Sequence, residues 1–158
     1  MNDKNTKKLF DDFPEFFKHK ENIQESLMAF GFECGDGWFD LIYKLCSDIK
    51  KMYNCVIPKD FYVVQVKEKF GGLRFYVTFA SEEVHDLIHV AENESMYICE
   101  HCGKKGEYFY RDKLPWILTL CNDCLKKRIK DRNLDEGDYI SSWQKKNKAP
   151  FKIIKVGE

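Results

Sequence analysis

The sequence predicts an α+β fold: N-terminal helices on an antiparallel, hairpin-based sheet, followed by a treble-clef or zinc-ribbon-like module. Apolar residues recur every three or four positions over residues 37–53, the period of an amphipathic helix. Residues 61–80 are rich in valine and aromatic side chains on both sides of Gly71-Gly72, which is typical of a β-hairpin. Two Cys-x-x-Cys pairs follow at a spacing typical of zinc sites.

The N-terminal part is expected to contain two helices. A first helix is predicted between Pro14 and Gly31, because proline suits a first turn and glycine a helix end, with apolar residues at helical spacing between them. The polar residues 1–12 are expected to fray. The second helix covers residues 37–53, and Asp36 stands where an N-cap residue is expected.

The hairpin is expected to turn at Gly71-Gly72, which pairs Phe70 with Leu73 and places Glu68 in the apolar row that faces the core. A carboxylate in such a row must be paired, hydrogen-bonded or functional, because burying it alone is costly. Two ordinary alternatives stay open: an ion pair at the edge of the sheet, or a bulge that changes the register. A third helix is predicted to begin directly after the hairpin, at Ser81.

Two features outside the cysteines suit a ligand. The outer face of the hairpin gathers basic and aromatic side chains that could hold an anion such as phosphate. The loop before the second helix contains glycines, which let a ligand approach the backbone closely. The alternatives are a solvated hairpin tip and a capped helix start with a buried tryptophan. The candidate ligand-binding residues are Asp36, Trp38, Lys67, Glu68, Lys69, Arg74 and Tyr76, and no catalytic residue is assigned.

The cysteine pairs carry the clearest chemical signal. They are Cys99 with Cys102 and Cys121 with Cys124. Gly103 fits a tight knuckle after the first pair, two short strands follow, and the second pair opens a helix. Four thiolates complete the tetrahedral shell of a structural Zn²⁺ and leave no open position for catalysis. The predicted cofactor is therefore structural zinc; redox cysteines and an iron–sulfur cluster are the alternatives.

Composition constrains the surroundings of the protein. Lysine plus arginine and aspartate plus glutamate both number 26, so the chain as a whole has no electrostatic preference for nucleic acid. No stretch approaches the roughly 20 apolar residues of a membrane span, and the N-terminus lacks the apolar core of a signal peptide. The other cysteines are scattered, which predicts a cytoplasmic protein without disulfides. They are Cys34, Cys46 and Cys55.

We expect three parts along the chain: an α+β body over 1–95, a four-cysteine zinc module over 96–133, and a basic tail over 134–158 that docks on the rest. Basic residues outnumber acidic ones from residue 125 onwards. Their concentration in the helix predicted over 125–132 leaves nucleic-acid binding by a zinc finger as an open alternative.

Three stretches carry a resemblance: residues 31–42, residues 65–76 and the two cysteine pairs. With their Cys-Gly-Asp-Gly-Trp loop, Val-Lys-Glu-Lys-Phe-Gly-Gly-Leu-Arg-Phe-Tyr hairpin and paired cysteines, they resemble a family of small, uncharacterised zinc-binding proteins of phages and bacteria. The resemblance covers about residues 31–124. It implies zinc binding, a phage or prophage origin and hence the host cytoplasm, and it suggests that loop and hairpin form one site. It implies no activity.

These observations favour a non-enzymatic zinc-binding protein that acts as a binding module or inhibitor of a host protein or a small anionic ligand. Interference with host defence is a purpose that the implied phage origin alone suggests. The alternatives are a nucleic-acid-binding zinc finger and an enzyme that uses Glu68 as general base beside Arg74. Against the enzyme, the sequence offers no partner acid, nucleophile or open metal position.

Overall fold

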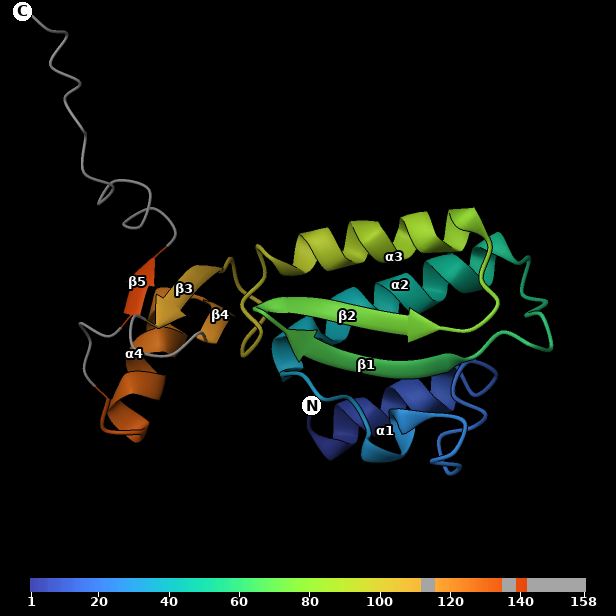
Figure 1. Ribbon diagram of the computed structural model, residues 1–158, viewed down its shortest axis with the longest axis horizontal. Helices are drawn as coiled ribbons and strands as arrows, with labels where there is room; N and C mark the ends of the chain where they lie inside the picture. The colour runs from blue at the N-terminus through green and yellow to red at the C-terminus, as the bar shows by residue number, and fades with distance from the viewer. Residues whose placement is uncertain (112–115, 135–138, 142–158) are drawn as a thin grey trace, which may run out of the picture.

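The computed structural model describes residues 1–111, 116–134 and 139–141 (Figure 1). As the sequence predicts, the fold is α+β, with helices, small antiparallel sheets and a C-terminal cysteine cluster. The described helices are α1 (Asp3–Asp12), α2 (Phe39–Met52), α3 (Glu82–Ser95) and α4 (Asn122–Asp131), with short 3₁₀ helices η1 (Leu27–Phe30) and η2 (Asp36–Trp38). The described strands are β1 (Val63–Lys69), β2 (Gly72–Val77), β3 (Glu107–Arg111), β4 (Trp116–Leu120) and β5 (Tyr139–Ser141).

The N-terminal helix lies earlier in the chain than predicted. α1 covers the stretch that was expected to fray, because Asn2 caps its first turn and Leu9 is fully buried in the core. In place of the helix predicted over residues 14–31, the chain forms turns and the short η1. Phe16 and Phe17 still reach the core from these turns. Their apolar spacing therefore reflects burial and not a helix.

The second predicted helix is confirmed: α2 runs over Phe39–Met52 and is preceded by η2. Its apolar side chains are buried, as the period of three and four requires. α3 begins directly after Ser81, its predicted start, and packs against both α2 and β2. Figure 1 shows α2 and α3 on one side of the hairpin and α1 along the β1 side.

The β1–β2 hairpin turns one residue earlier than predicted. Lys69 pairs with Gly72, and the turn consists of Phe70 and Gly71, with φ angles of 55° and 77°. Positive φ at both central positions is the pattern of a type I′ turn, which matches the twist of paired strands. The predicted turn at Gly71-Gly72 is therefore wrong. Glu68 lies opposite Leu73 and not Phe75, so the pairing differs from the prediction by two residues. A shift of two residues keeps Glu68 in the row of the core-facing side chains.

Both edges of this two-stranded sheet are covered. On β2, the N–H of Leu73 donates to the Ser95 hydroxyl at 2.9 Å, and the N–H of Phe75 donates to the Glu92 carboxylate at 3.2 Å. On β1, Glu33 forms a parallel bridge and exchanges two backbone hydrogen bonds of 3.0 Å with the strand. Backbone groups that would otherwise stay unpaired at a sheet edge thus find partners.

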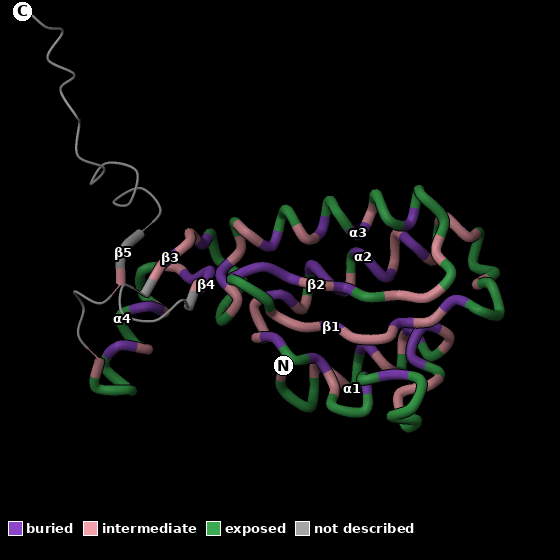
Figure 2. Tube along the Cα trace, viewed as in Figure 1, coloured by how far each residue is buried: buried purple, intermediate pink, exposed green. Residues whose placement is uncertain are grey.

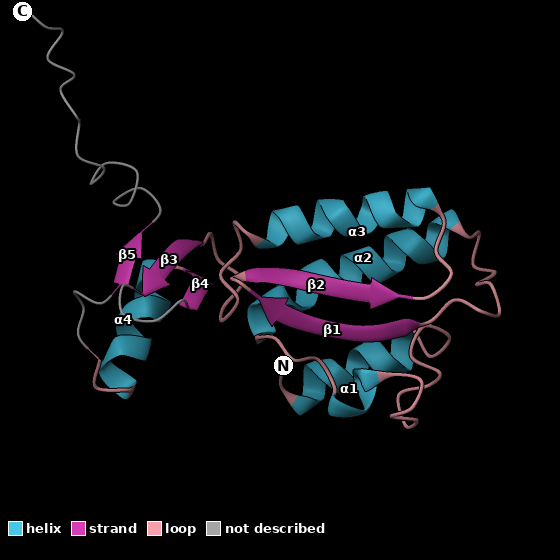
Figure 3. Ribbon diagram, viewed as in Figure 1, coloured by secondary structure: helices cyan, strands magenta, loops and turns pink. Residues whose placement is uncertain are grey.

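Buried apolar side chains form two clusters among the described residues (Figure 2). The larger one lies between the hairpin and helices α1, α2 and α3. The smaller one belongs to the second sheet, ordered β4-β3-β5, and to α4 (Figure 3). It consists of Cys99, Phe109, Leu118, Leu120, Leu125 and Ile129. Of the predicted tail over 134–158, only Leu134 and β5, which pairs with β3, lie within the described residues.

Candidate metal centre

The four paired cysteines converge on one point. The sulfur atoms of Cys99, Cys102, Cys121 and Cys124 all lie within 4.8 Å of one another, and none is in a disulfide. A tetrahedron with Zn–S bonds of about 2.3 Å separates its sulfurs by roughly 3.8 Å. The Sγ atoms of Cys102 and Cys121 are 3.6 Å apart. The cluster therefore has the donors and the spacing to hold one thiolate-bound metal ion.

Two local structures present these sulfurs. The first pair lies in a tight turn closed by the N–H of Cys99, which donates to Lys104 at 2.7 Å, and by the N–H of Gly103, which donates to Cys99 at 2.9 Å. Gly103 has φ of 77°, a conformation in which glycine carries no steric penalty. Cys121 is the N-cap of α4, and Cys124 lies in its first turn. The positive end of the helix dipole favours thiolates at this place.

Backbone N–H groups favour negative charge on two of the sulfurs, those of Cys99 and Cys121. Burial raises the pKa of Cys99, and N–H groups of Cys121, Cys102 and His101 oppose this shift. For Cys121, burial is outweighed by hydrogen bonds from the Cys124 N–H and the neighbouring thiols, which lower its pKa to about 7. His101 itself is exposed and is not among the four converging ligands.

The loop over residues 34–38, predicted to approach a ligand, lies against the cysteine turn. The N–H of Gly37 donates to the carbonyl of Glu100 at 2.7 Å, and a Cβ on Gly37 would lie 2.1 Å from the carbonyl oxygen of Cys99. Trp38 is fully buried, and its indole N–H donates to the carbonyl of Ile98 at 2.9 Å. The glycines therefore allow one backbone to touch another, and Trp38 is inaccessible to a ligand.

Asp36 connects this loop to α1. Its carboxylate accepts a hydrogen bond from the backbone N–H of Asn2 at 2.8 Å and another from the side chain of Asn5 at 3.1 Å. Partial burial opposes ionisation, but these hydrogen bonds outweigh it and lower the pKa of Asp36. The prediction that Asp36 is the N-cap of the second helix is wrong. Trp38 occupies the N-cap position of α2, and the turn around Asp36 is a 3₁₀ helix.

The hairpin tip contacts the second sheet. The half-buried carboxylate of Glu68 accepts the Gly71 N–H at 2.6 Å and so closes the turn. The carbonyl of Gly71 accepts a hydrogen bond from the buried hydroxyl of Thr119, and a Cβ on Gly71 would lie 2.7 Å from the ring of Tyr108. The sequence left open that Glu68 is a catalytic base. In the structure its carboxylate binds the N–H of Gly71 in the hairpin turn.

The outer face of the hairpin brings the remaining candidates together. Lys67 lies directly opposite Arg74, and its ammonium group is 5.8 Å from the centre of the Tyr76 ring. Arg74 donates to the carbonyl of Leu73 at 2.6 Å and lies 3.9 Å from the carboxylate of Glu92. The remaining candidate, Lys69, is exposed at the tip. This face is basic, but two of its charged side chains, Lys67 and Arg74, already interact with neighbouring residues.

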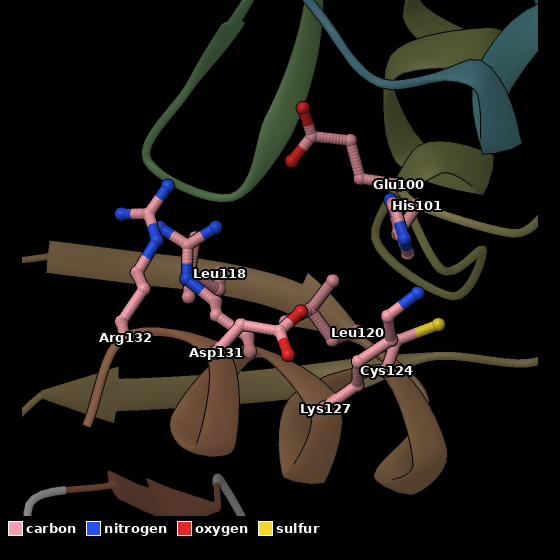
Figure 4. Close-up of a pocket in the computed structure, with 9 residues that line it drawn as sticks. Glu100, His101, Leu118, Leu120, Cys124, Lys127, Asp131 and Arg132 are labelled. Carbon is pink, nitrogen blue, oxygen red and sulfur yellow. The ribbon is translucent and has the colours of Figure 1, made fainter. Parts of the chain in front are cut away.

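Sequence reasoning missed a pocket of about 250 Å³ beside the cysteine cluster (Figure 4). The cysteine turn, β4 and α4 supply its walls, so only the folded module brings them together. Burial raises the pKa of Glu100 in this pocket, although a hydrogen bond from the Gly35 N–H opposes the shift. The lining residues are Glu100, His101, Leu118, Leu120, Cys124, Lys127, Arg128, Asp131 and Arg132. The basic positions of α4 were visible in the sequence, but their partners from the cysteine turn were not.

Within the described ranges, no helix has the length and apolar character that crossing a membrane requires. In comparisons with known proteins, no family model, no curated protein and no solved structure matches the chain. The candidate metal centre is therefore supported by its own geometry.

Proposed function

We propose that this chain is a zinc-binding protein in which one structural Zn²⁺ joins a treble-clef module to an α+β body, and that the protein acts by binding a partner without catalysis. The observation that carries the zinc assignment is the convergence of four cysteine sulfurs within 4.8 Å. Four thiolates saturate tetrahedral zinc, so the metal would stabilise the fold and would offer no position to a substrate.

The order of elements around the cysteines supports a treble clef. A knuckle with the first pair is followed by the β3–β4 hairpin and then by α4, whose first turn carries the second pair. Among the residues that the structure describes, the small apolar cluster beneath these elements contains six buried side chains. Such a small cluster needs additional stabilisation, which a metal can supply.

A binding role is supported by what the candidate residues do. Trp38 is buried and Glu68 closes its own turn, so neither is free to act on a substrate. We propose a host protein or a small anionic ligand as the partner, with the phage-related resemblance as the biological context. The basic surface that such a partner requires is present on the hairpin and, next to the cysteine cluster, on α4.

Native mass spectrometry with elemental analysis tests the metal. We expect one zinc per chain in the protein purified without added metal, and we expect its loss in Cys102→Ser. Cys55→Ser is the matched control, because Cys55 is exposed and lies outside the cluster. Iron in place of zinc, or a metal content that Cys102→Ser leaves unchanged, would refute the proposed centre.

Nucleic-acid binding is a second candidate function, favoured by the exposed Lys126, Lys127 and Lys130 on α4. Contacts to several phosphates make such affinity fall steeply with salt. Titration of labelled single- and double-stranded oligonucleotides at 50 and 200 mM salt would show this slope. An absence of binding at the lower salt concentration would exclude this function.

A further inference from the structure

The pocket beside the cysteine cluster has a strongly polar wall and an apolar floor (Figure 4). Leu118 and Leu120 of β4 form the apolar part, and both are almost fully buried. Charged side chains enter from α4 on one side and from the cysteine turn on the other. In Figure 4 the Asp131 carboxylate lies below the Glu100 carboxylate, and the Arg132 guanidinium points from the end of α4 toward the tip of the β1–β2 hairpin.

The positive charges of this pocket outnumber its carboxylates. Lys127, Arg128 and Arg132 all line it, and Arg128 lies one helical turn before Arg132. Like charges four residues apart on a helix repel one another. Among the described residues, none of these three side chains forms an ion pair within 4.0 Å. An anion placed between Arg128 and Arg132 would turn this repulsion into attraction.

Arg128 supplies an independent observation. Its Nε atom is buried and has no hydrogen-bond partner in the part of the chain that the structure describes. A buried donor without a partner costs free energy, and such groups in proteins are nearly always satisfied. The Nε and Nη groups of arginine together form the fork that binds two oxygens of a phosphate or carboxylate. Arg128 therefore carries an unsatisfied donor in the wall of the pocket that it lines.

We propose that this pocket binds the phosphate group of a small phosphate monoester or of inorganic phosphate. Arg128 would donate through its fork, Arg132 would provide a second guanidinium, and Lys127 would add a point charge. Glu100 and Asp131 limit the excess of positive charge, which suits one phosphate better than a long polyanion. The volume of about 250 Å³ lies just below the usual range for drug-sized ligands and fits a compact one.

This inference rests on the proposed function, because zinc would hold the cysteine turn that forms one wall, and it specifies the small anionic ligand. The site differs from the one that the sequence suggested: it lies against α4 and the cysteine turn, and not between the hairpin and the loop over 34–38. The leucines would contact the carbon part of a monoester.

Calorimetric titration of the full zinc-loaded chain with inorganic phosphate, and separately with ribose 5-phosphate, tests the proposal. We expect one site per chain, and we expect Arg128→Gln and Arg132→Gln each to weaken binding at least about tenfold, because each removes hydrogen bonds to a charged group. Lys126→Gln is the matched control, since Lys126 lies on the same helix outside the pocket and should bind as the unmodified chain does.

Zinc content is measured in every variant, which separates the two proposals. A chain that lacks zinc would refute the proposed function, whereas a zinc-loaded chain that binds neither phosphate compound would refute the pocket alone. Equal weakening by Lys126→Gln would also refute it, because the effect would then be general charge. Binding of an oligonucleotide that inorganic phosphate does not displace would assign this surface to nucleic acid and overturn the small-ligand proposal.

Discussion

At the scale of single residues, backbone contacts through Gly37 and Trp38 join the loop over 34–38 to the cysteine turn. The sequence singles out Trp38 but cannot show its partner, because the indole donates to a carbonyl 60 residues later in the chain. The metal ligands could be recognised, since two cysteines in one tight turn chelate locally and their spacing alone indicates the site. Local chemistry was therefore predictable, whereas contacts between distant segments required the fold.

Gly37→Ala should test this contact. The new Cβ would lie 2.1 Å from the Cys99 carbonyl oxygen and 2.4 Å from the Gly103 nitrogen, and backbone atoms in a tight turn cannot move aside. We expect a loss of about 3 kcal/mol or more in the free energy of unfolding, together with weaker zinc binding. Chemical denaturation and competition with a zinc chelator measure the two effects.

Gly31→Ala is the control for this substitution. Gly31 has φ of 70°, so alanine there is strained, but its Cβ would meet only a side chain at 3.7 Å. Stability should fall while zinc affinity stays unchanged. Unaltered zinc affinity in Gly37→Ala as well would contradict the proposed role of the loop in supporting the metal centre.

The seven cysteines should fall into three classes of reactivity. Cys55 is exposed and should react first, and the zinc-bound cluster should react only after chelation. Burial raises the pKa of Cys34 to about 12 and that of Cys46 still higher, so both remain protonated thiols at pH 8 and should react only on unfolding. Counting labelled thiols by mass spectrometry should give one, then five, then seven. Fast labelling of all seven in the presence of zinc would contradict this order.

At the scale of elements, periodicity predicted α2 well because a single helix buries one continuous face. It failed for residues 14–31, where consecutive turns bury phenylalanines at a similar spacing. The hairpin was predictable as a pair of strands, but its turn was not. Gly71 in the observed turn lies against side chains of β3 and β4. These strands are distant in sequence, so the hairpin sequence alone does not contain this contact.

Phe70→Asn should stabilise the hairpin. Phe70 adopts φ of 55° and its side chain is 62% exposed, so it bears the cost of a left-handed conformation with little burial in return. Asparagine followed by glycine is a preferred type I′ sequence. We expect a gain of about 1 kcal/mol in the free energy of unfolding. In Tyr97→Asn, which also removes an exposed aromatic ring but leaves the turn intact, we expect no such gain.

Ser95→Ala should weaken the contact between α3 and β2. The Ser95 hydroxyl is fully buried and accepts the N–H of Leu73 at 2.9 Å, so its removal leaves a buried donor without a partner. The expected loss in the free energy of unfolding is about 1–3 kcal/mol. Ser47→Ala is the matched control, because within the described chain the Ser47 hydroxyl donates to its own helix alone, and its loss should cost less than about 0.5 kcal/mol. Equal losses in both variants would show that the edge contact does not stabilise the sheet.

At the scale of the whole molecule, the described residues form two separate apolar clusters, and hydrogen bonds to backbone groups connect them. The contacts converge on the cysteine turn and the hairpin tip, through Gly37, Trp38 and Gly71. The sequence predicted both parts, since each has its own pattern, but not the way they join. A metal at the four cysteines would fix the cysteine turn. Because the α+β body contacts this turn, the metal would therefore stabilise the body as well.

Removal of zinc should consequently destabilise the α+β body. If the cysteine turn loosens, Trp38 loses its hydrogen bond to Ile98, and its ring gains access to water. In a chain where Trp116 and Trp143 are replaced by phenylalanine, the emission of Trp38 should shift to longer wavelength on chelation and return with added Zn²⁺, but not with Mg²⁺. Loss of contacts of about 3 kcal/mol would lower the unfolding midpoint of a protein of this size by roughly 6–12 °C. An unchanged midpoint and unchanged Trp38 emission after complete removal of the metal would show that the body folds independently of the module, because a body supported by the cysteine turn cannot lose that support without effect.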